Sequence, residues 1–144
     1  MKYLIFFSGI LFLFAACSPK PKPIEYGVDK CDFCRMTIVD AQHGAEVVTT
    51  KGKVYKFDAI ECMVRYVGEK GENTFSSFWV NDLTTTAGEL VDATSCTYLI
   101  SQNVPSPMGA FLSGFAEKET AKEWQQEKSG ELFDWAGLLM KMND

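Results

Sequence analysis

Histidine and a surplus of positive charge are what this sequence most clearly lacks. It contains one histidine, and 14 lysines and arginines against 19 aspartates and glutamates leave a formal net charge of −5. Without a basic face, the chain has no electrostatic footprint for nucleic acid. No serine, histidine and aspartate set and no poised carboxylate pair indicates a catalytic site. The composition is that of a globular protein, which excludes a disordered or collagen-like chain.

Long hydrophobic runs are also missing, except at the N-terminus. The chain opens MKYLIFFSGILFLFAAC, in which the apolar run ends at Ala16. A membrane-spanning helix needs about 20 apolar residues, so we interpret residues 1–16 as a lipoprotein signal peptide. Ala15 and Ala16 directly before Cys17 resemble a bacterial lipobox, in which Cys17 is lipidated and becomes the first mature residue. A short uncleaved membrane anchor is the alternative, and either one places the rest of the chain outside the cytoplasm.

A proline-rich segment follows the candidate lipidation site. Residues 17–28 contain SPKPKPIEYG, whose alternating prolines favour an extended polyproline conformation. We therefore expect residues 17–28 to be a lipid anchor and spacer that extends without packing. Residues 29–144 are long enough for one compact domain with its own core, and we divide them into halves at about 29–88 and 89–144.

The expected order of strands and helices is repeated in the two halves. In the first half, AEVVTT and VYKF around KGK predict a hairpin, and FSSFWVND predicts a further strand. Between them, Asp58 as N-cap and Glu61 three residues later form a capping-box pattern, which predicts a helix that ends at GEKG. In the second half, SCTYLIS and PMGAFLSGF predict strands, and AEKETAKEWQQEK predicts a helix ended by Ser129 and Gly130. The sequence thus predicts an α+β fold of two related ββαβ half-domains packed into one unit, with the state of ELFDWAGLLMKM left open.

The cysteines allow several kinds of site. Four remain after the candidate lipidation site, and an even number in an oxidising compartment permits structural disulfides, although a domain of this size does not need them. Cys31 and Cys34 form a C-x-x-C pair. A thioredoxin-like pair stands at the start of a helix that follows a strand, whereas this one follows a proline-rich spacer. A structural zinc site needs four ligands, and the only further candidates are the isolated Cys62, Cys96 and His43.

Methionine distinguishes a soft-metal site from those alternatives. Thiolate and thioether sulfurs favour Cu(I). Met36 lies two residues after Cys34, and in an extended segment this spacing puts both side chains on one face, so that they can bind one ion. Met108 in SPMGAF is a further candidate because its flanking proline and glycine make the backbone irregular; an ordinary core methionine is its alternative.

Three other residues belong to the candidate set. At 100° per residue, Cys62 points away from the apolar face of its expected helix, so we expect it to face a ligand or a second interface and not the core. His43 is either a solvated loop residue or, as a neutral imidazole near the sulfurs, the group that completes a three-coordinate site. Cys31 either ligates the ion or guards the site. Cys96 is expected to be a small buried residue within a strand.

At these residues the sequence resembles the NosL family of membrane-anchored, copper-binding accessory proteins for nitrous oxide reductase maturation. The resemblance is carried by FAAC, FCRMTIV with the following His43, KGKVYKFDAIECMVRYV, FWVND and SPMGAF. It implies two related ββαβ units and one Cu(I), for which Cys34 and Met36 match the family's C-x-M and Met108 matches its Met-Gly motif. It also implies a partner, the membrane-bound copper-site maturation apparatus of the reductase. Arg35 departs from the family, because many relatives have glycine there, and the second-half segment is poor in methionine.

Our hypothesis is a Cu(I) metallochaperone, not an enzyme, that is lipid-anchored through Cys17 to the periplasmic face of a bacterial membrane. It would supply copper for nitrous oxide reductase maturation in denitrification. The candidate metal ligands are Cys31, Cys34, Met36, His43, Cys62 and Met108. The enzyme alternative is a thiol-disulfide oxidoreductase that uses Cys31 and Cys34. A third possibility is a lipoprotein that only scaffolds partners, in which every cysteine is replaceable.

Overall fold

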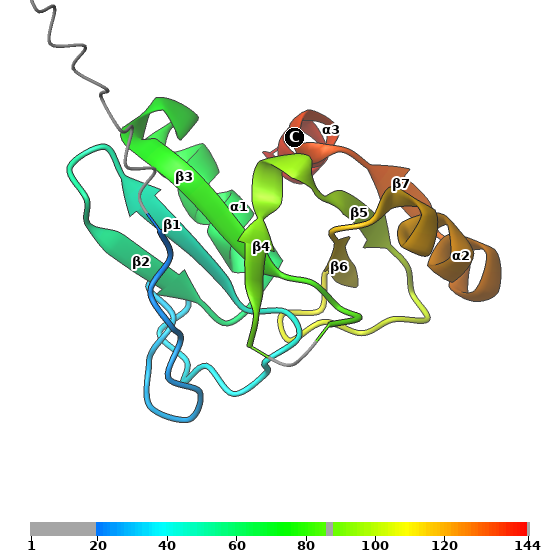
Figure 1. Cartoon of the computed structure of the whole chain (residues 1–144), viewed down its shortest axis with the longest axis horizontal. Helices are drawn as coiled ribbons and strands as arrows, with labels where there is room; N and C mark the ends of the chain where they lie inside the picture. Colours follow the sequence, from blue (N-terminus) through cyan, green and yellow to red (C-terminus); the bar gives the residue numbers. More distant parts are fainter. Residues whose placement is uncertain (1–19, 86–87, 144) are drawn as a thin grey trace, which may run out of the picture.

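The computed structural model describes residues 20–85 and 88–143. The predicted signal peptide and Cys17 lie outside the described residues. Two antiparallel sheets stand next to each other, and helices pack on them (Figure 1). None of the helices in the described ranges is long and apolar enough to cross a membrane.

The first sheet has four strands. They are β1 (Ala45–Thr49), β2 (Val54–Phe57), β3 (Phe75–Asn81) and β4 (Leu90–Asp92), in the order β2-β1-β3-β4. Helix α1 (Ile60–Lys70) connects β2 to β3 through the short 3-10 helix η1 (Glu72–Thr74), and a second 3-10 helix, η2 (Ala93–Ser95), follows β4. The predicted hairpin and the strand of FSSFWVND are both present. β4 comes after the expected boundary between the halves but pairs with β3 of the first sheet.

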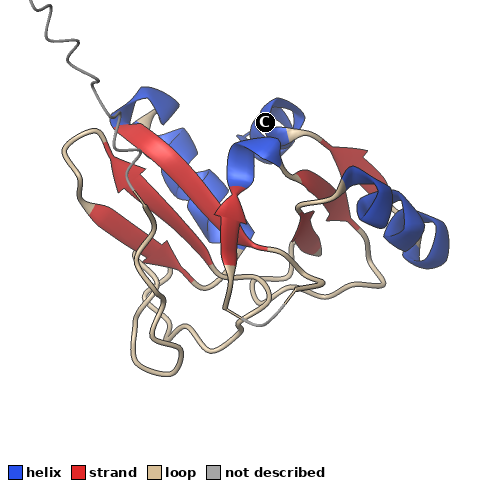
Figure 2. Cartoon of the chain, viewed as in Figure 1, coloured by secondary structure: helices blue, strands red, loops and turns tan. Residues whose placement is uncertain are grey.

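The second sheet repeats the topology of the first. Its strands are β5 (Thr97–Ile100), β6 (Leu112–Phe115) and β7 (Glu131–Phe133), in the order β6-β5-β7, with α2 (Lys118–Lys128) between β6 and β7. In each unit the first strand is central and the helix precedes the third strand (Figure 2). The predicted α+β fold of two ββαβ units is confirmed. The C-terminal segment that the sequence left open forms β7 and then α3 (Trp135–Asn143).

Helix α1 begins differently from the prediction. Its N-cap is Ala59, which makes no side-chain capping bond. Asp58 instead accepts a hydrogen bond from the Cys34 thiol at 3.5 Å, and Glu61 accepts one from the Ser106 hydroxyl at 2.5 Å. The predicted capping box is therefore wrong, because partners from distant segments take both carboxylates. The apolar face was predicted correctly, since Ile60, Met63, Val64 and Val67 are all buried.

The proline-rich spacer packs on the domain in its described part. The blue segment in Figure 1 crosses in front of β1 and β2. The backbone N–H of Lys22 donates to Glu46 Oε1 at 2.7 Å, Ile24 is buried, and Lys56 Nζ donates to the carbonyl of Pro23 at 2.7 Å. The expectation that residues 17–28 extend without packing is thus wrong for the portion from Lys22 onward. We call residues 20–28 the strap.

The two units share a tight joint close to the start of α1. The N–H of Leu83, just after β3, donates to the carbonyl of Gly114 in β6 at 2.9 Å. Ile60 Cδ1 lies only 3.2 Å from where a Cβ on Gly114 would stand, so a side chain at this position would push against α1. The joint fixes the beginning of α1 against the second sheet.

Candidate metal centre

CDFCRM, residues 31–36, forms a closed turn. Lys30 and Thr37 pair as an isolated antiparallel bridge, and the N–H of Cys31 donates to the carbonyl of Met36 at 2.8 Å. Arg35 has a φ of 68°, in the left-handed region where glycine is unstrained. The segment is therefore not extended, and the geometric argument that placed Cys34 and Met36 on one face is wrong. A glycine at this position would adopt the same φ without strain.

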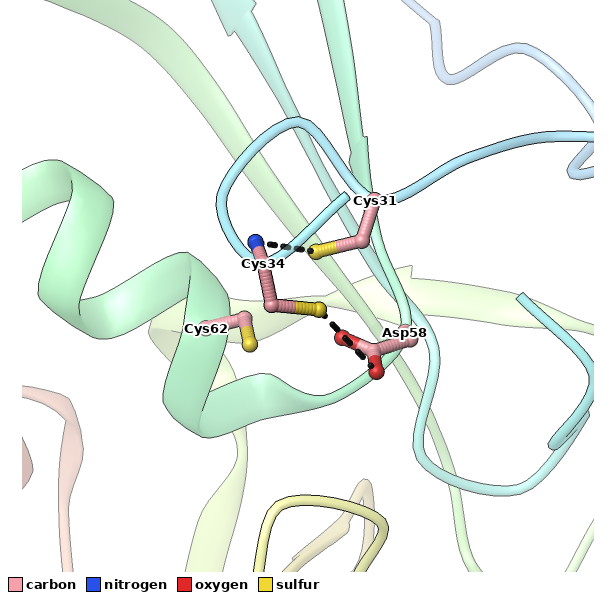
Figure 3. A group of neighbouring side chains, drawn as sticks. All are labelled: Cys31, Cys34, Asp58 and Cys62. Atoms are coloured by element: carbon pink, nitrogen blue, oxygen red, sulfur yellow. Dashed lines mark hydrogen bonds between the residues drawn. The ribbon is translucent and has the colours of Figure 1, made fainter. Parts of the chain in front are cut away.

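The turn brings two cysteines to a third cysteine and a carboxylate. Cys31 and Cys34 come from the turn, Asp58 follows β2, and Cys62 lies in the first turn of α1 (Figure 3). One ligand atom from each of these residues lies within 4.8 Å of all the others. We call these four residues the thiol cluster. In the part of the chain that the structure describes, all four cysteines are free thiols.

The thiol cluster is mostly buried. Cys31 and Cys62 are completely inaccessible to solvent, and Asp58 is 4% exposed. Only Cys34 is half-buried, so it is the member of the cluster that faces solvent. The burial of Cys62 corrects the expectation that it lies off the core: α1 is covered on that side by the turn of residues 31–36, which a helical projection does not include.

Hydrogen bonds favour a thiolate at Cys31. The Cys62 thiol donates to Cys31 Sγ, and this bond lowers the pKa of Cys31 to about 6 against the opposing effect of burial. Backbone hydrogen bonds from Asp58, Cys34 and Phe33 lower this pKa further, the one from the Cys34 N–H at 3.4 Å. Backbone N–H groups that converge in a turn form a concave anion site. The chain thus stabilises one sulfur anion in its interior.

The two other thiols favour the protonated form. The hydrogen bond that Cys62 donates to Cys31 raises the pKa of Cys62 well above its ordinary range, and burial adds to this effect. Burial raises the pKa of Cys34 to about 11 against the lowering effect of a backbone hydrogen bond with Met36, and Cys31 and Asp58 add smaller upward contributions. A cation that binds the cluster must therefore displace protons from these two sulfurs.

Two carboxylates at the start of α1 are incompletely satisfied. Asp58 Oδ1 and Glu61 Oε2 are buried and have no hydrogen-bond partner. Burying such an oxygen without a partner costs about 1–3 kcal/mol. Sequence reasoning assigned both residues to helix capping and so missed Asp58 as a site residue. The sequence offered no separate signal for Asp58, because a carboxylate just before a helix satisfies the capping rule equally well.

The predicted methionine ligands lie in two loops near the cluster. Met36 closes the turn of residues 31–36 through its carbonyl, and its side chain is 57% exposed. Met108 is partly buried against the main hydrophobic core. Its loop is held to α1 by the hydrogen bond from Ser106 to Glu61, next to Cys62 in the chain. Ligation by either methionine stays a prediction.

His43 and Cys96 are engaged elsewhere. His43 is 5% exposed, with Nδ1 at 3.0 Å from Asp40 Oδ2 and Nε2 at 3.3 Å from Ser113 Oγ. Both ring nitrogens are thus in hydrogen bonds outside the thiol cluster, and His43 is not the solvated loop residue of the alternative. Cys96 is buried as expected, but it lies just before β5 and not within it.

Asp40, His43 and Ser113 form a hydrogen-bonded series that the sequence did not reveal. Residues of these three types also make up hydrolase triads. Ser113 is completely buried and His43 almost so, which leaves no path for a substrate carbonyl to the hydroxyl. The series instead ties the loop before β1 to β6 and strengthens the joint between the two units.

Paired ββαβ units and a buried group of three thiols and a carboxylate define a class of small α+β protein with a candidate metal centre. A family model described as NosL matches residues 23–142. The chain belongs to the NosL family.

Two relatives illustrate the likeness. The chain is 29% identical over 101 residues to the copper-binding lipoprotein NosL of Stutzerimonas stutzeri, and the match covers 65% of this chain and 53% of that protein. This chain thus spans about half the length of that relative. The crystal structure of the copper chaperone NosL from Shewanella denitrificans matches with a TM-score of 0.73 at 16% identity, over 82% of this chain and 94% of that one. At this identity the likeness concerns the fold.

Proposed function

We propose that this protein is a Cu(I)-binding metallochaperone, and that the thiol cluster is the core of its copper site. The observation that supports this most is the convergence of three cysteine sulfurs from two segments within 4.8 Å. Thiolate sulfur is the donor that selects Cu(I) over harder ions. The copper-binding relatives within the same family support the same cargo.

The unequal exposure of its cysteines suits the thiol cluster to the transfer of copper to a partner. Cys31 and Cys62 are completely buried and hold the ion away from water, whereas Cys34 is half-buried. A sulfur from a partner can approach on the side of Cys34 and displace one ligand without opening the core. Met36, exposed beside Cys34 in the turn, and Met108 are proposed as additional soft ligands, in agreement with the motifs that the sequence shares with the family.

The oxidoreductase alternative requires the opposite arrangement of the two cysteines. A redox-active C-x-x-C pair exposes the thiol of low pKa, because that thiolate attacks the substrate disulfide. Here the pKa of the completely buried Cys31 is lowered to about 6, whereas that of the half-buried Cys34 is raised to about 11. The accessible sulfur is thus the poorer nucleophile, which favours metal binding over disulfide exchange.

Localisation and partner complete the proposal. Residues 1–16 would be removed as a lipoprotein signal peptide, Cys17 would anchor the chain to the periplasmic face of a bacterial membrane, and residues 29–144 would carry copper. The partner would be the membrane-bound apparatus that builds the copper sites of nitrous oxide reductase. The family resemblance and the lipobox-like sequence support these assignments.

The decisive experiment is an anaerobic titration of the reduced protein with Cu(I) against a competing chelator. We expect one Cu(I) per chain. Cys34→Ser should weaken the affinity for Cu(I) at least about tenfold, because one of the direct ligands of the ion is lost. Cys96→Ser is the matched control, since Cys96 is a buried thiol outside the cluster. Equal affinities for Cys34→Ser and Cys96→Ser would contradict the proposed site.

A second pair of variants tests the methionines separately. Met36→Leu and Met108→Leu keep the apolar volume and remove the thioether. Weaker Cu(I) binding with an unchanged unfolding temperature would support ligation by sulfur. Unchanged affinity in both variants would leave the cysteines as the ligands and exclude the methionines.

A further inference from the structure

Four side chains of the first unit form a continuous series of cations and aromatic rings. The Lys53 ammonium lies 4.5 Å from the centroid of the Tyr55 ring, and the Lys70 ammonium lies 5.6 Å from that of Tyr66. The two tyrosine rings contact each other, with their centroids 5.2 Å apart. Residues two apart along a strand and four apart along a helix share a face, which is why each lysine stands over its tyrosine.

The turn between β1 and β2, at the upper left of Figure 1, adds a third lysine at the same end of the unit. The Thr50 N–H donates to the carbonyl of Thr74 at 3.0 Å, and Thr74 Oγ1 donates to the carbonyl of Lys70 at 2.9 Å. These two bonds tie the turn that carries Lys51 to the last residue of α1. All three lysines are exposed and both tyrosines are half-buried. We call Lys51, Lys53, Tyr55, Tyr66 and Lys70 the lysine-tyrosine patch.

The three lysines of the patch have no ion-pair partner among the described residues. The nearest carboxylates in the sequence are directed toward α3. Glu72 Oε1 accepts a hydrogen bond from Trp135 Nε1 at 3.0 Å, and Glu69 lines a groove together with Met142 of α3. The patch therefore keeps its positive charges available to an external anion.

The charge of the molecule is unevenly distributed. Residues 17–88 contain nine lysines and arginines against ten carboxylates, and four of these carboxylates are buried. Residues 89–144 contain four lysines and nine carboxylates. The surplus of negative charge thus belongs to the C-terminal part of the chain. An anionic surface attracts the first part, which carries the lysine-tyrosine patch, and repels the second.

The lipid anchor of the proposed function can reach the same end of the molecule. The Lys22 N–H is bonded to Glu46, which precedes the end of β1 by three residues, about 10 Å. Cys17 precedes Lys22 by five residues, a stretch that spans at most about 18 Å. A lipid on Cys17 can therefore lie in the same plane as the turn between β1 and β2.

We propose that the lysine-tyrosine patch is a membrane-facing surface that binds the headgroups of anionic phospholipids. Lysine near an anionic membrane surface is attracted to it, and tyrosine is enriched at membrane–water interfaces because its ring has one apolar and one polar end. The inference rests on the proposed lipid anchor and deepens it: the anchor limits the distance to the membrane, and the patch sets the orientation. Cys62 lies eight residues before Lys70, about 12 Å along α1, so this orientation keeps the thiol cluster near the membrane surface.

The test measures which lysines the membrane covers. The lipidated full chain is added to the outside of vesicles of phosphatidylcholine alone, or of phosphatidylcholine mixed with phosphatidylglycerol. Flotation of the vesicles shows whether the protein is anchored. A membrane-impermeant reagent then acylates accessible lysines, and mass spectrometry of the peptides gives the rate at each one. Lys118 of α2 and Lys141 of α3 are the internal reference, because both are exposed and neither is in an ion pair among the described residues.

Acylation of Lys51, Lys53 and Lys70 should be slower on the vesicles with phosphatidylglycerol by about fivefold, the gain expected for one lysine at an anionic surface. The rates at Lys118 and Lys141 should stay the same. The difference should disappear at about 1 M salt, where charges are screened beyond about 3 Å.

A pair of double variants separates the patch from charge in general. Lys51 should lose its protection in Lys53→Gln with Lys70→Gln and keep it in the matched control, Lys118→Gln with Lys141→Gln. An unchanged near-ultraviolet circular dichroism spectrum shows that both double variants are folded.

Three outcomes would count against the inference. Equal acylation of Lys51 on the two kinds of vesicle, in a protein that floats with both, would overturn it and leave the anchor intact; the surface would then be open to a protein partner. Protection of Lys118 and Lys141 in place of the patch would reverse the orientation and overturn it as well. A protein that floats with neither kind of vesicle would overturn the proposed anchor together with the inference.

Discussion

At the scale of single residues, the chain holds several carboxylates in places where water cannot reach them. Glu46 is completely buried on β1, yet only its Oε1 is satisfied, by the N–H of Lys22 at 2.7 Å. Asp58 and Glu61 are in a similar state at the start of α1. Each buried oxygen without a partner lowers the free energy of unfolding. These carboxylates are therefore positions where the sequence does not maximise the stability of the fold, as is typical of functional sites.

Glu46 leads to a prediction about pH. Burial raises its pKa from 4.5 to about 7, against the hydrogen bond from the Lys22 backbone and the nearby charge of Lys56. Because the pKa is raised in the folded state, the stabilising effect of its protonation is fully present below pH 4.5 and is lost as the pH rises through about 7. The free energy of unfolding should fall by up to about 3 kcal/mol more across this window in the unmodified chain than in Glu46→Gln. Urea unfolding of both proteins at pH 4.5 and 8 measures this, and parallel changes in the two would contradict it.

The same residues show where sequence reasoning succeeds and where it stops. The spacing of Cys31 and Cys34, and the soft donors around them, identify the turn as a candidate metal site without any structure. Asp58 is not identifiable in this way. A carboxylate before a helix satisfies the local capping rule equally well. Whether Asp58 caps the helix or belongs to the cluster is decided by the position of the turn of residues 31–36. Cys34 in that turn is 24 residues away from Asp58 in the sequence.

At the scale of elements, local periodicity predicted most strands and helices of the two ββαβ units. The errors fall where one element covers another. A helical projection placed Cys62 away from the core because it cannot include the turn of residues 31–36. The strap was expected to extend without packing because its alternating prolines fix φ and remove hydrogen-bond donors, whereas Ile24 and Lys56 attach it to the first sheet.

The loop between β5 and β6 gives a prediction at this scale. Ser106 Oγ donates to Glu61 Oε1 at 2.5 Å and is the hydroxyl that joins this loop to α1. Ser106→Ala should lower the free energy of unfolding by about 1–3 kcal/mol, because it leaves the buried Glu61 carboxylate without that donor. Chemical denaturation measures the loss, and Ser106→Thr, which keeps the hydroxyl, is the control.

A second variant separates this effect from a simple loss of packing. In a Glu61→Gln background the buried group is neutral and costs less to leave unpaired. Ser106→Ala should therefore cost less there than in the unmodified chain, which a double-mutant cycle detects as a coupling energy. Additive losses would show that the Glu61 charge is not what Ser106 stabilises.

At the scale of the whole molecule, the strap lies between the proposed membrane anchor and the turn of residues 31–36. Lys56 binds the strap at the Pro23 carbonyl and Asp29 at 2.6 Å, just before the turn begins. Cys17 precedes the first described residue by three positions, a stretch that spans at most about 11 Å. A lipid on Cys17 would thus hold the domain close to the membrane, where a membrane-bound partner can reach the thiol cluster.

The anchor can be tested apart from the metal. When the full chain is expressed in a bacterium that processes lipoproteins, we expect it in the membrane fraction. The Cys17→Ser variant should lack the lipid. If its signal sequence is still cleaved, the variant moves to the soluble periplasmic fraction, and if cleavage is blocked, it stays in the membrane with the signal sequence attached. Mass spectrometry of the N-terminus measures the difference, because a lipidated Cys17 carries acyl chains of known mass. Cys96→Ser, which alters a cysteine of the domain, should keep the lipid. An N-terminus without acyl chains in the unmodified protein would contradict the lipobox assignment. The Cu(I) affinity of Cys17→Ser should equal that of the unmodified chain, since the thiol cluster begins 14 residues later at Cys31.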